Sequence, residues 1–187
     1  MEEVCISSDF HQATPVTLKQ SNVKSREKPE LLIDDFTRGF HDWFSLNPDH
    51  PTLWEHWMRK VTDPKWRGPE NAQVALRIRS EAPNVLAVVL KENAWRGYRG
   101  QERTYVTEVT LQGGLPETVV LELGDFRDTE DGHSPYSWAE MDQLAFCARY
   151  VDNRRQSNEE PQIIAAQLWQ GPKPTFERLE WRVSGGR

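Results

Sequence analysis

The segment Lys91–Arg103, KENAWRGYRGQER, carries the side chains best suited to hold a ligand. Two aromatic residues stand among arginines, and glycines separate them. An aromatic ring offers a flat apolar face, and a guanidinium group offers fixed hydrogen-bond donors to hydroxyl or carboxylate groups. These are the parts of a saccharide site, which we predict here from Trp95, Arg96, Tyr98, Arg99 and Arg103. The alternative is a long hairpin loop in which Trp95 packs beneath a sheet and the arginines are solvated.

A second group of candidate ligand-binding residues comes from three predicted strands. Arg77 and Arg79 alternate with Leu76 and Ile78, so we expect both arginines on the solvent-facing side of their strand. The full group consists of Trp54, His56, Arg77, Arg79 and Gln143. The order of the strands decides whether these side chains share one polar face, and the sequence leaves that order open.

Motifs for catalysis and metal binding are weak. In the acidic loop Asp125–Asp131, aligning Gly132 with the invariant glycine of an EF-hand places Arg127 at the first ligand position and Trp138 at the twelfth, which excludes an EF-hand. The five histidines show no zinc spacing, and no G-x-S-x-G, Walker or G-x-G-x-x-G motif occurs. Carboxylates are numerous, but no pair is singled out for glycoside hydrolysis. The sequence favours binding over catalysis and leaves the enzyme question open.

The elements that must position these groups are strands. Apolar residues recur with a period of two, and turn-forming pairs such as Asp63-Pro64, Gly113-Gly114 and Gly171-Pro172 interrupt them at short intervals. The run Leu86–Leu90 is apolar on both faces, which indicates a central strand. The pattern predicts an all-β fold, an antiparallel β-sandwich. The predicted strands include Leu53–Val61, Val74–Arg79, Leu86–Leu90, Tyr105–Leu111, Val119–Leu123, Leu144–Ala148, Ile163–Trp169 and Phe176–Val183.

Packing residues are predicted from the same alternation. The last strand should bury Leu179, Trp181 and Val183. Of the eight tryptophans, we assign four to core or edge packing: Trp43, Trp66, Trp138 and Trp181.

The chain is organised as one domain behind an extension. Residues 1–30 lack sustained periodicity and include a charged stretch, so we expect an N-terminal extension or linker. The predicted domain runs from residue 31 to residue 184. Cys5 and Cys147 are too few for a disulfide scaffold, and two unrelated buried thiols are favoured over a pair.

Charge and hydropathy narrow the choice of partners. The formal net charge is −6 and the basic residues are spread along the chain, so we expect no nucleic acid partner. No apolar run reaches membrane-spanning length, so we expect no membrane partner. The acidic start lacks the features of a secretory signal. We therefore expect either a cytoplasmic protein or a fragment of an extracellular or periplasmic one.

Two segments of the sequence share a pattern, a predicted strand that ends in Asp-Phe. Leu31–Trp43 (LLIDDFTRGFHDW) and Val119–Phe146 each contain a predicted strand that ends in Asp-Phe. The second segment continues into Trp-x-x-Met-Asp-x-Leu, which begins at Trp138. Over residues 31–183 this pattern resembles jelly-roll carbohydrate-binding domains of the galactose-binding-like type.

The resemblance implies a non-catalytic module that binds an oligo- or polysaccharide. Such a module would be an accessory domain beside other domains of a larger carbohydrate-active protein, such as a glycoside hydrolase or esterase. The resemblance also implies a structural calcium ion, held by carboxylate and carbonyl oxygens at the edge of the sandwich. The matching carboxylates here are Asp34 or Asp35 and Asp142. Without calcium, Asp34 and Asp35 are turn or edge carboxylates and Asp142 is a hydrogen-bonding strand residue.

Two other interpretations remain. The pattern also resembles the assembly-factor domains of complex I intermediate-associated proteins, which bind proteins. An exposed apolar patch around Trp95 and Trp54, without sugar binding, would favour this interpretation. A hydrolase is the third hypothesis, and it requires two carboxylates or a Ser-His pair in one pocket with shifted pKa values.

Overall fold

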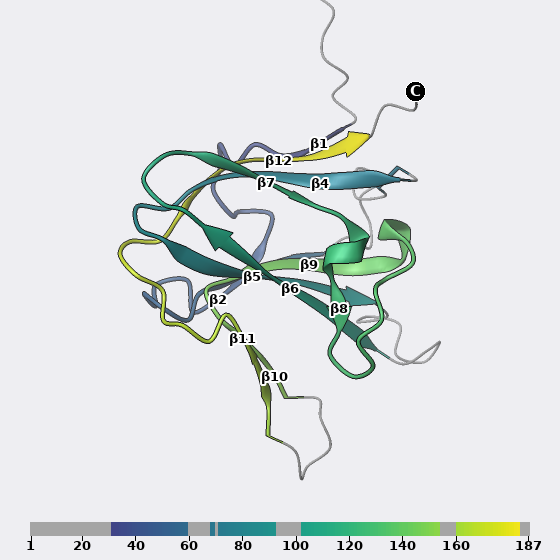
Figure 1. Ribbon diagram of the computed structural model, residues 1–187. Coiled ribbons are helices and arrows are strands. Elements are labelled where there is room, and N and C mark those ends of the chain that lie inside the picture. Colours follow the sequence, from purple (N-terminus) through teal and green to yellow (C-terminus); the bar gives the residue numbers. More distant parts are fainter. Residues whose placement is uncertain (1–30, 60–67, 70, 93–101, 154–159, 184–187) are drawn as a thin grey trace, which may run out of the picture.

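The computed structural model describes residues 31–59, 68–69, 71–92, 102–153 and 160–183. Two sheets face each other across a hydrophobic core, and every strand pair in these residues is antiparallel (Figure 1). The predicted all-β antiparallel sandwich is therefore confirmed. No helix in this part of the chain has the length and apolar character needed to cross a membrane.

One sheet has four strands and lies at the top of Figure 1. Its spatial order is β1 (Leu32–Asp34), β12 (Thr175–Val183), β4 (Ala72–Arg79) and β7 (Glu117–Leu121). The long strands β12 and β4 form its centre, and β1 covers only the middle of β12, where Leu32 lies opposite Glu180.

The other sheet has six strands. Its spatial order is β2 (Phe44–Leu46), β3 (Glu55–Arg59), β9 (Met141–Cys147), β5 (Asn84–Glu92), β6 (Arg103–Leu111) and β8 (Arg127–Asp128). The predicted central strand is confirmed, since β5 lies between β9 and β6 and its residues 86–90 are buried. The segment predicted at Leu53–Val61 forms a strand over Glu55–Arg59.

Short elements complete the described chain. Two 3-10 turns, η3 (Leu123–Asp125) and η4 (Trp138–Glu140), lie before β8 and β9. A separate hairpin of β10 (Tyr150–Asp152) and β11 (Gln162–Ile164) projects from the outer side of the six-stranded sheet (Figure 1).

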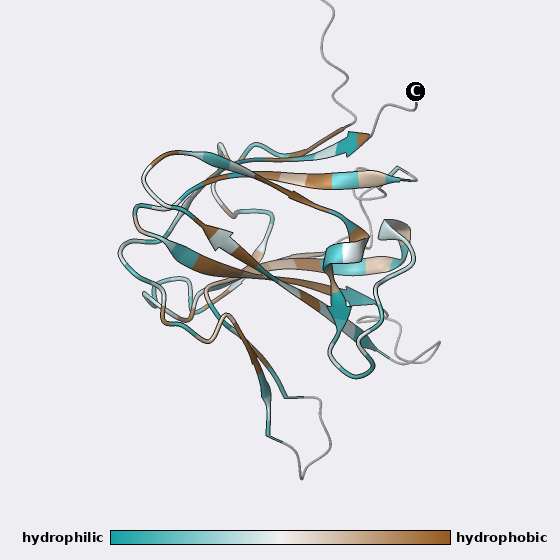
Figure 2. Ribbon diagram, in the orientation of Figure 1, coloured by the Kyte–Doolittle hydropathy of each residue, from teal (hydrophilic) through white to brown (hydrophobic). Residues whose placement is uncertain are grey.

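Every second side chain along the strands points inward, and these side chains fill the space between the sheets. On β4, Val74, Leu76 and Ile78 are buried, while Arg77 and Arg79 are exposed, as predicted. Figure 2 shows hydrophobic residues concentrated on the strands of both sheets (Figure 2). The core also contains three of the tryptophans assigned to packing, Trp43, Trp138 and Trp181; Trp66 lies outside the described residues.

Asn84 fixes the turn that carries the chain from one sheet to the other. Its buried amide nitrogen donates hydrogen bonds to Ser80 Oγ at 3.0 Å and to the Ala82 carbonyl at 3.1 Å. The same nitrogen bonds the Gln170 carbonyl at 3.0 Å, and the amide oxygen accepts from the Gln170 backbone N–H at 2.7 Å. One side chain thus ties this turn to the segment that leads into β12.

Some details of the predicted strands are wrong. Leu123 lies in the turn η3, because β7 ends at Leu121. The segment Ile163–Trp169 is a strand only up to Ile164, because Ala165 turns the backbone to a positive φ of 53°. Val183 was predicted to be buried, but it is half-exposed at the end of β12. The third core residue of this strand is Phe176, which is buried with Leu179 and Trp181.

Candidate functional site

The six-stranded sheet has an outer face that points away from the core. On β3, Met58 packs into the core, and His56 contacts core aromatic rings, including Phe40 and Phe176. Because side chains alternate along a strand, Glu55 and Trp57 lie on the outer face.

The registers of β3, β9 and β5 align their outward side chains in rows across this face. The first row contains Glu55, Cys147 and Ala87; the second contains Trp57, Ala145 and Val89; the third contains Gln143 and Lys91. The small side chains in these rows are fully buried, and polar and aromatic side chains stand beside them.

The edge strand β2 extends two of these rows. Phe44 lies opposite Trp57, and Leu46 lies opposite Glu55. Phe44 is 48% exposed, whereas Trp57 is only 8% exposed. The open ring on this face is therefore that of Phe44, and Trp57 lies beneath its neighbours.

Trp57 organises the charged groups around it. Its indole Nε1 donates a hydrogen bond to Glu55 Oε2 at 2.6 Å. Lys91 Nζ lies 5.4 Å from the centre of the Trp57 ring, within the range of a cation–π contact, and pairs with Glu102 Oε1 at 2.9 Å. These contacts fix a carboxylate and an ammonium group on the same face.

Burial raises the pKa of two side chains in the first row, Glu55 and Cys147. Burial raises the pKa of Glu55, and the hydrogen bond from Trp57 and the charge of Lys91 oppose this rise. The pKa of the Cys147 thiol lies well above its ordinary value because the thiol is buried and Glu55 is nearby. Cys147 is a free buried thiol, and Cys5 lies outside the described residues.

The base of the β10–β11 hairpin covers one part of the outer face. Tyr150 packs edge-on against Trp57, with 5.9 Å between ring centres. Ile164 joins them in a second apolar cluster, separate from the main core. The Ala165 backbone N–H donates to Glu108 Oε1 at 2.6 Å, which fastens the hairpin to β6.

Two buried polar atoms, one just after β9 and one on β6, have no hydrogen-bond partner within the part of the chain that the structure describes. Arg149 Nε lies between the end of β9 and Tyr150, and Thr104 Oγ1 lies opposite Lys91 in the register of β5 and β6. Buried polar groups are normally hydrogen-bonded, but both atoms are closed off from solvent and so are out of reach of a ligand on this face.

No model of a protein family matches the chain, and no curated protein matches it. Among solved structures, the chain is similar to a family 11 carbohydrate-binding module from Clostridium thermocellum, determined in complex with a β-1,3-1,4-mixed-linked tetrasaccharide. The two are 13% identical, the match covers 82% of this chain and 95% of that chain, and the TM-score is 0.49.

The predicted loop site is only partly described. Trp95, Arg96, Tyr98 and Arg99 lie outside the described residues. Arg103 begins β6, where its Nη1 contacts Asp128 Oδ2 at 3.2 Å and Asp131 Oδ2 at 3.0 Å. These carboxylates raise the pKa of the Arg103 guanidinium above its ordinary value.

The second predicted group does not share one face. Trp54 is wholly buried and His56 is buried beside it in the core. Arg77 and Arg79 lie on the outer face of the four-stranded sheet, and Gln143 lies on the outer face of the six-stranded sheet. The strand order separates the arginines from Gln143, and the alternation of β3 is opposite to the predicted one.

The calcium prediction finds no matching donor set in the described residues, where no three His, Cys, Asp or Glu side chains gather to hold a metal ion. Asp34 accepts hydrogen bonds from the Phe36 N–H and from Trp43 Nε1, both at 2.8 Å. Asp35 accepts from Thr37 N and Oγ1, which lowers its pKa. Asp142 lies in the six-stranded sheet, and its buried Oδ2 has no hydrogen-bond partner among the described residues. Calcium stays a prediction, which calorimetric titration with Ca²⁺ would test.

Sequence reasoning missed Phe44, Glu55, Trp57 and Tyr150, and it included Lys91 only as the first residue of the predicted loop segment. A signal for β3 exists in the segment EHWMR, because its charged residues Glu55 and Arg59 share one phase with Trp57. In a strand with one solvent-exposed side, the alternate positions that carry charged residues point toward solvent. Tyr150 carries no such signal, because it reaches the site through a hairpin.

Proposed function

We propose that this domain is a non-catalytic carbohydrate-binding module that holds an oligo- or polysaccharide on the outer face of its six-stranded sheet. The observation that carries the proposal is that one exposed aromatic ring, Phe44, lies on the same outer face as the fixed polar groups of Glu55 and Lys91. A sugar presents an apolar C–H face to a ring and hydroxyl groups to charged donors and acceptors.

The chemistry of the polar groups suits hydroxyl recognition. A carboxylate accepts hydrogen bonds, an ammonium group donates them, and the amide of Gln143 does both. Glu55 is held by Trp57, and Lys91 is held by Glu102, so both are oriented before a ligand arrives. Such preorganisation lowers the entropy cost of binding.

The length of the face suits a short chain of sugars. Phe44 lies on β2 and Lys91 lies on β5, with β3 and β9 between them. Three strand spacings span about 14 Å, which is more than one sugar ring covers. We therefore infer that the ligand is an oligosaccharide segment, as part of a larger glycan.

The test is a glycan array followed by affinity electrophoresis in neutral polysaccharides, including a β-1,3-1,4-mixed-linked glucan. Phe44→Ala is expected to weaken binding at least tenfold, because it removes the exposed ring without disturbing the core. The matched control is Tyr136→Ala, which removes an even more exposed ring, outside the strands. A folded protein that binds no glycan, or equal binding by both variants, would contradict the proposal.

A protein-interaction domain is the second candidate function. Apolar side chains are exposed on β2 and on the hairpin: Phe44, Leu46, Val151 and Ile163. Exposed apolar patches mark protein interfaces as well as ligand grooves. Loss of self-association or of a protein partner in Val151→Ser and Ile163→Ser, with no glycan bound by the wild-type protein, would favour this candidate.

A further inference from the structure

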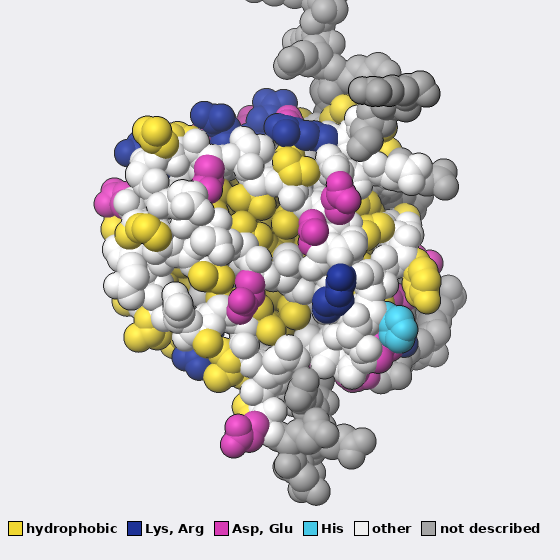
Figure 3. Space-filling model, viewed as in Figure 1, with side chains coloured by type: hydrophobic (Ala, Val, Ile, Leu, Met, Phe, Trp, Pro, Cys, Tyr) yellow, Lys and Arg dark blue, Asp and Glu magenta, His cyan; other side chains and the backbone are white. Residues whose placement is uncertain are grey.

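The outer face of the four-stranded sheet carries a set of arginines on two adjacent central strands. Arg178 of β12 lies directly opposite Arg77 of β4. Arg182 lies further along β12 on the same face, and Arg79 lies further along β4. Figure 3 shows Lys and Arg side chains gathered along the top of the molecule, over this sheet (Figure 3). This concentration of positive charge stands out in a chain whose formal net charge is −6.

Placing two like charges opposite each other in a sheet is unfavourable. Here two glutamates offset the cost. Arg77 Nε pairs with Glu177 Oε2 at 2.6 Å, and Arg178 Nε pairs with Glu180 Oε2 at 2.5 Å. Glu177 lies where the register of β12 shifts between Phe176 and Arg178, so a bulge supplies this carboxylate.

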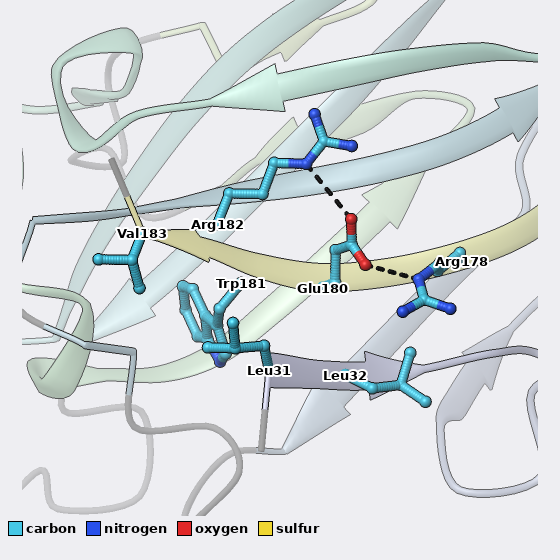
Figure 4. A pocket seen from close by; sticks show the side chains of 7 residues that line it. All are labelled: Leu31, Leu32, Arg178, Glu180, Trp181, Arg182 and Val183. Atoms are coloured by element: carbon cyan, nitrogen blue, oxygen red, sulfur yellow. Dashed lines mark hydrogen bonds and ion pairs between the residues drawn. The ribbon is translucent and has the colours of Figure 1, made fainter. Parts of the chain in front are cut away.

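Glu180 serves two guanidinium groups at once. Its Oε1 also contacts Arg182 Nε at 3.3 Å. Figure 4 shows the Glu180 carboxylate between the side chains of Arg178 and Arg182 (Figure 4). All three side chains are partly exposed, so a carboxylate from outside can reach the position that Glu180 occupies.

A groove runs beside this arrangement at the edge of β12. Its volume is about 470 Å³. Its polar lining comes from Arg178, Glu180 and Arg182, and its apolar lining comes from Leu31, Leu32, Trp181 and Val183. The groove therefore offers an apolar wall beside two guanidinium groups.

We propose that this face is a second binding site, which takes an acidic polysaccharide through its carboxylate or sulfate groups. A guanidinium group binds either anion through two parallel hydrogen bonds, and arginine is preferred over lysine where such planar contacts are made. The anion replaces Glu180 as the partner of Arg178 and Arg182, and the sugar ring lies against the apolar wall of the groove.

The spacing of the arginines favours a polymer with repeated charges. Alternate residues on one strand are about 6.7 Å apart, and neighbouring strands are about 4.8 Å apart. The four arginines thus form a flat track rather than one pocket. The arginines and glutamates of this face are charged groups, which the buried centre of a protein interface tends to exclude.

The experiment measures binding of the full chain to polygalacturonate, which carries one carboxylate on each sugar, by isothermal titration calorimetry. Methyl-esterified polygalacturonate is the matched neutral ligand, and dextran sulfate and dextran form the sulfate pair. We expect binding to the charged polymer of at least one pair, loss of binding to its neutral counterpart, and weakening by added salt. The double variant Arg77→Gln/Arg178→Gln should weaken this binding at least tenfold.

Glu180→Gln gives a test in the opposite direction. Removing the competing carboxylate should strengthen binding of the acidic polymer severalfold. The matched controls are Arg38→Gln and Asp42→Asn, which alter an exposed arginine–aspartate pair outside the lining of the groove, with 2.6 Å between Arg38 Nη2 and Asp42 Oδ2. Both controls should leave affinity unchanged, although each changes the net charge as much as one of the test substitutions does.

Three results would overturn the proposal. These are an unchanged affinity in the double arginine variant, equal gains in Glu180→Gln and Asp42→Asn, and equally tight binding of duplex DNA, which would indicate unspecific attraction of polyanions. The result is independent of the neutral-glycan site, because Phe44→Ala should not alter binding of the acidic polymer.

Discussion

His56 is an ionisable side chain held inside an aromatic cluster. Phe40 stacks on its ring with 3.6 Å between ring centres and an angle of 7° between the planes. Ser45 Oγ forms a 2.8 Å hydrogen bond with His56 Nδ1. Burial and the positive charge of Lys173 lower the pKa of His56 to about 4. The folded state therefore keeps this imidazole neutral at pH values where it would be protonated in water.

This shift makes stability depend on pH. The unfolded chain takes up a proton near pH 6.5, and the folded chain takes it up near pH 4, so the unfolded state binds more protons between these values. Stability should therefore fall as pH falls from about 6.5 to about 4, by on the order of 3 kcal/mol from this residue. Urea unfolding across this range measures the loss.

The variant His56→Phe isolates the contribution of the imidazole. Phenylalanine can keep the stack on Phe40 but takes up no proton, so the variant should lose less stability than the wild-type protein as pH falls. His133→Gln is the control, because His133 is exposed beside Asp131. If His56→Phe and the wild-type protein lose the same stability, protonation of His56 does not drive the acid sensitivity.

Single residues also explain why the predicted polar face was wrong. Trp54 and His56 have the composition of an exposed binding pair, but aromatic packing with Trp169 and Phe176 places them inside. Alternation predicts that neighbours on a strand point in opposite directions, and it does not say which set points inward. Two of the partner rings, Trp169 and Phe176, come from residues more than 100 positions away.

At the scale of elements, the loop between β6 and β7 packs closely against the turn between β4 and β5. Gly113 and Gly114 both have positive φ values, of 80° and 85°. A Cβ atom at Gly113 would lie 2.4 Å from the carbonyl carbon of Ala82, whereas one at Gly114 would meet nothing within 4 Å. The two glycines therefore share a backbone conformation and differ in the space around them.

Gly113→Ala should destabilise the protein by more than about 3 kcal/mol, because backbone strain adds to a clash with the turn before β5. Gly114→Ala should cost only about 1–2 kcal/mol, the price of the left-handed conformation. Thermal unfolding of the two variants measures the difference. Similar costs would show that the turn before β5 moves aside.

The strands were largely predictable, and their partners were not. Leu76, Ile78 and the run Leu86–Leu90 lie where the period of two and the apolar run place them. The order of strands depends on crossings between the sheets, which local sequence does not encode. For this reason Arg77 was correctly predicted to be exposed, but its separation from Gln143 was not predictable. Similarly, Trp57 and Tyr150 meet only because the hairpin folds back over the sheet.

At the scale of the whole molecule, the two outer faces differ in charge. Among the described side chains, the six-stranded sheet presents the carboxylates of Glu55 and Glu108 beside the ammonium group of Lys91. The four-stranded sheet presents arginines. The main core separates the faces, and packed sheets lie about 10 Å apart. A neutral glycan and an acidic polysaccharide should therefore bind without contact between them.

This separation predicts that the two sites act independently. The affinity for the neutral glycan should be the same in the absence and in the presence of saturating polygalacturonate, because sites more than 10 Å apart with no shared partners couple by less than about 0.5 kcal/mol. A variant that combines Phe44→Ala with Arg77→Gln/Arg178→Gln should lose affinity for the neutral glycan as Phe44→Ala does. It should lose affinity for the acidic polymer as the double arginine variant does. Calorimetric titration of one ligand against the other complex measures the coupling. Competition between the two polymers would mean that both occupy one face. Either the neutral glycan would then not bind the six-stranded sheet, or the acidic polymer would not bind the four-stranded sheet.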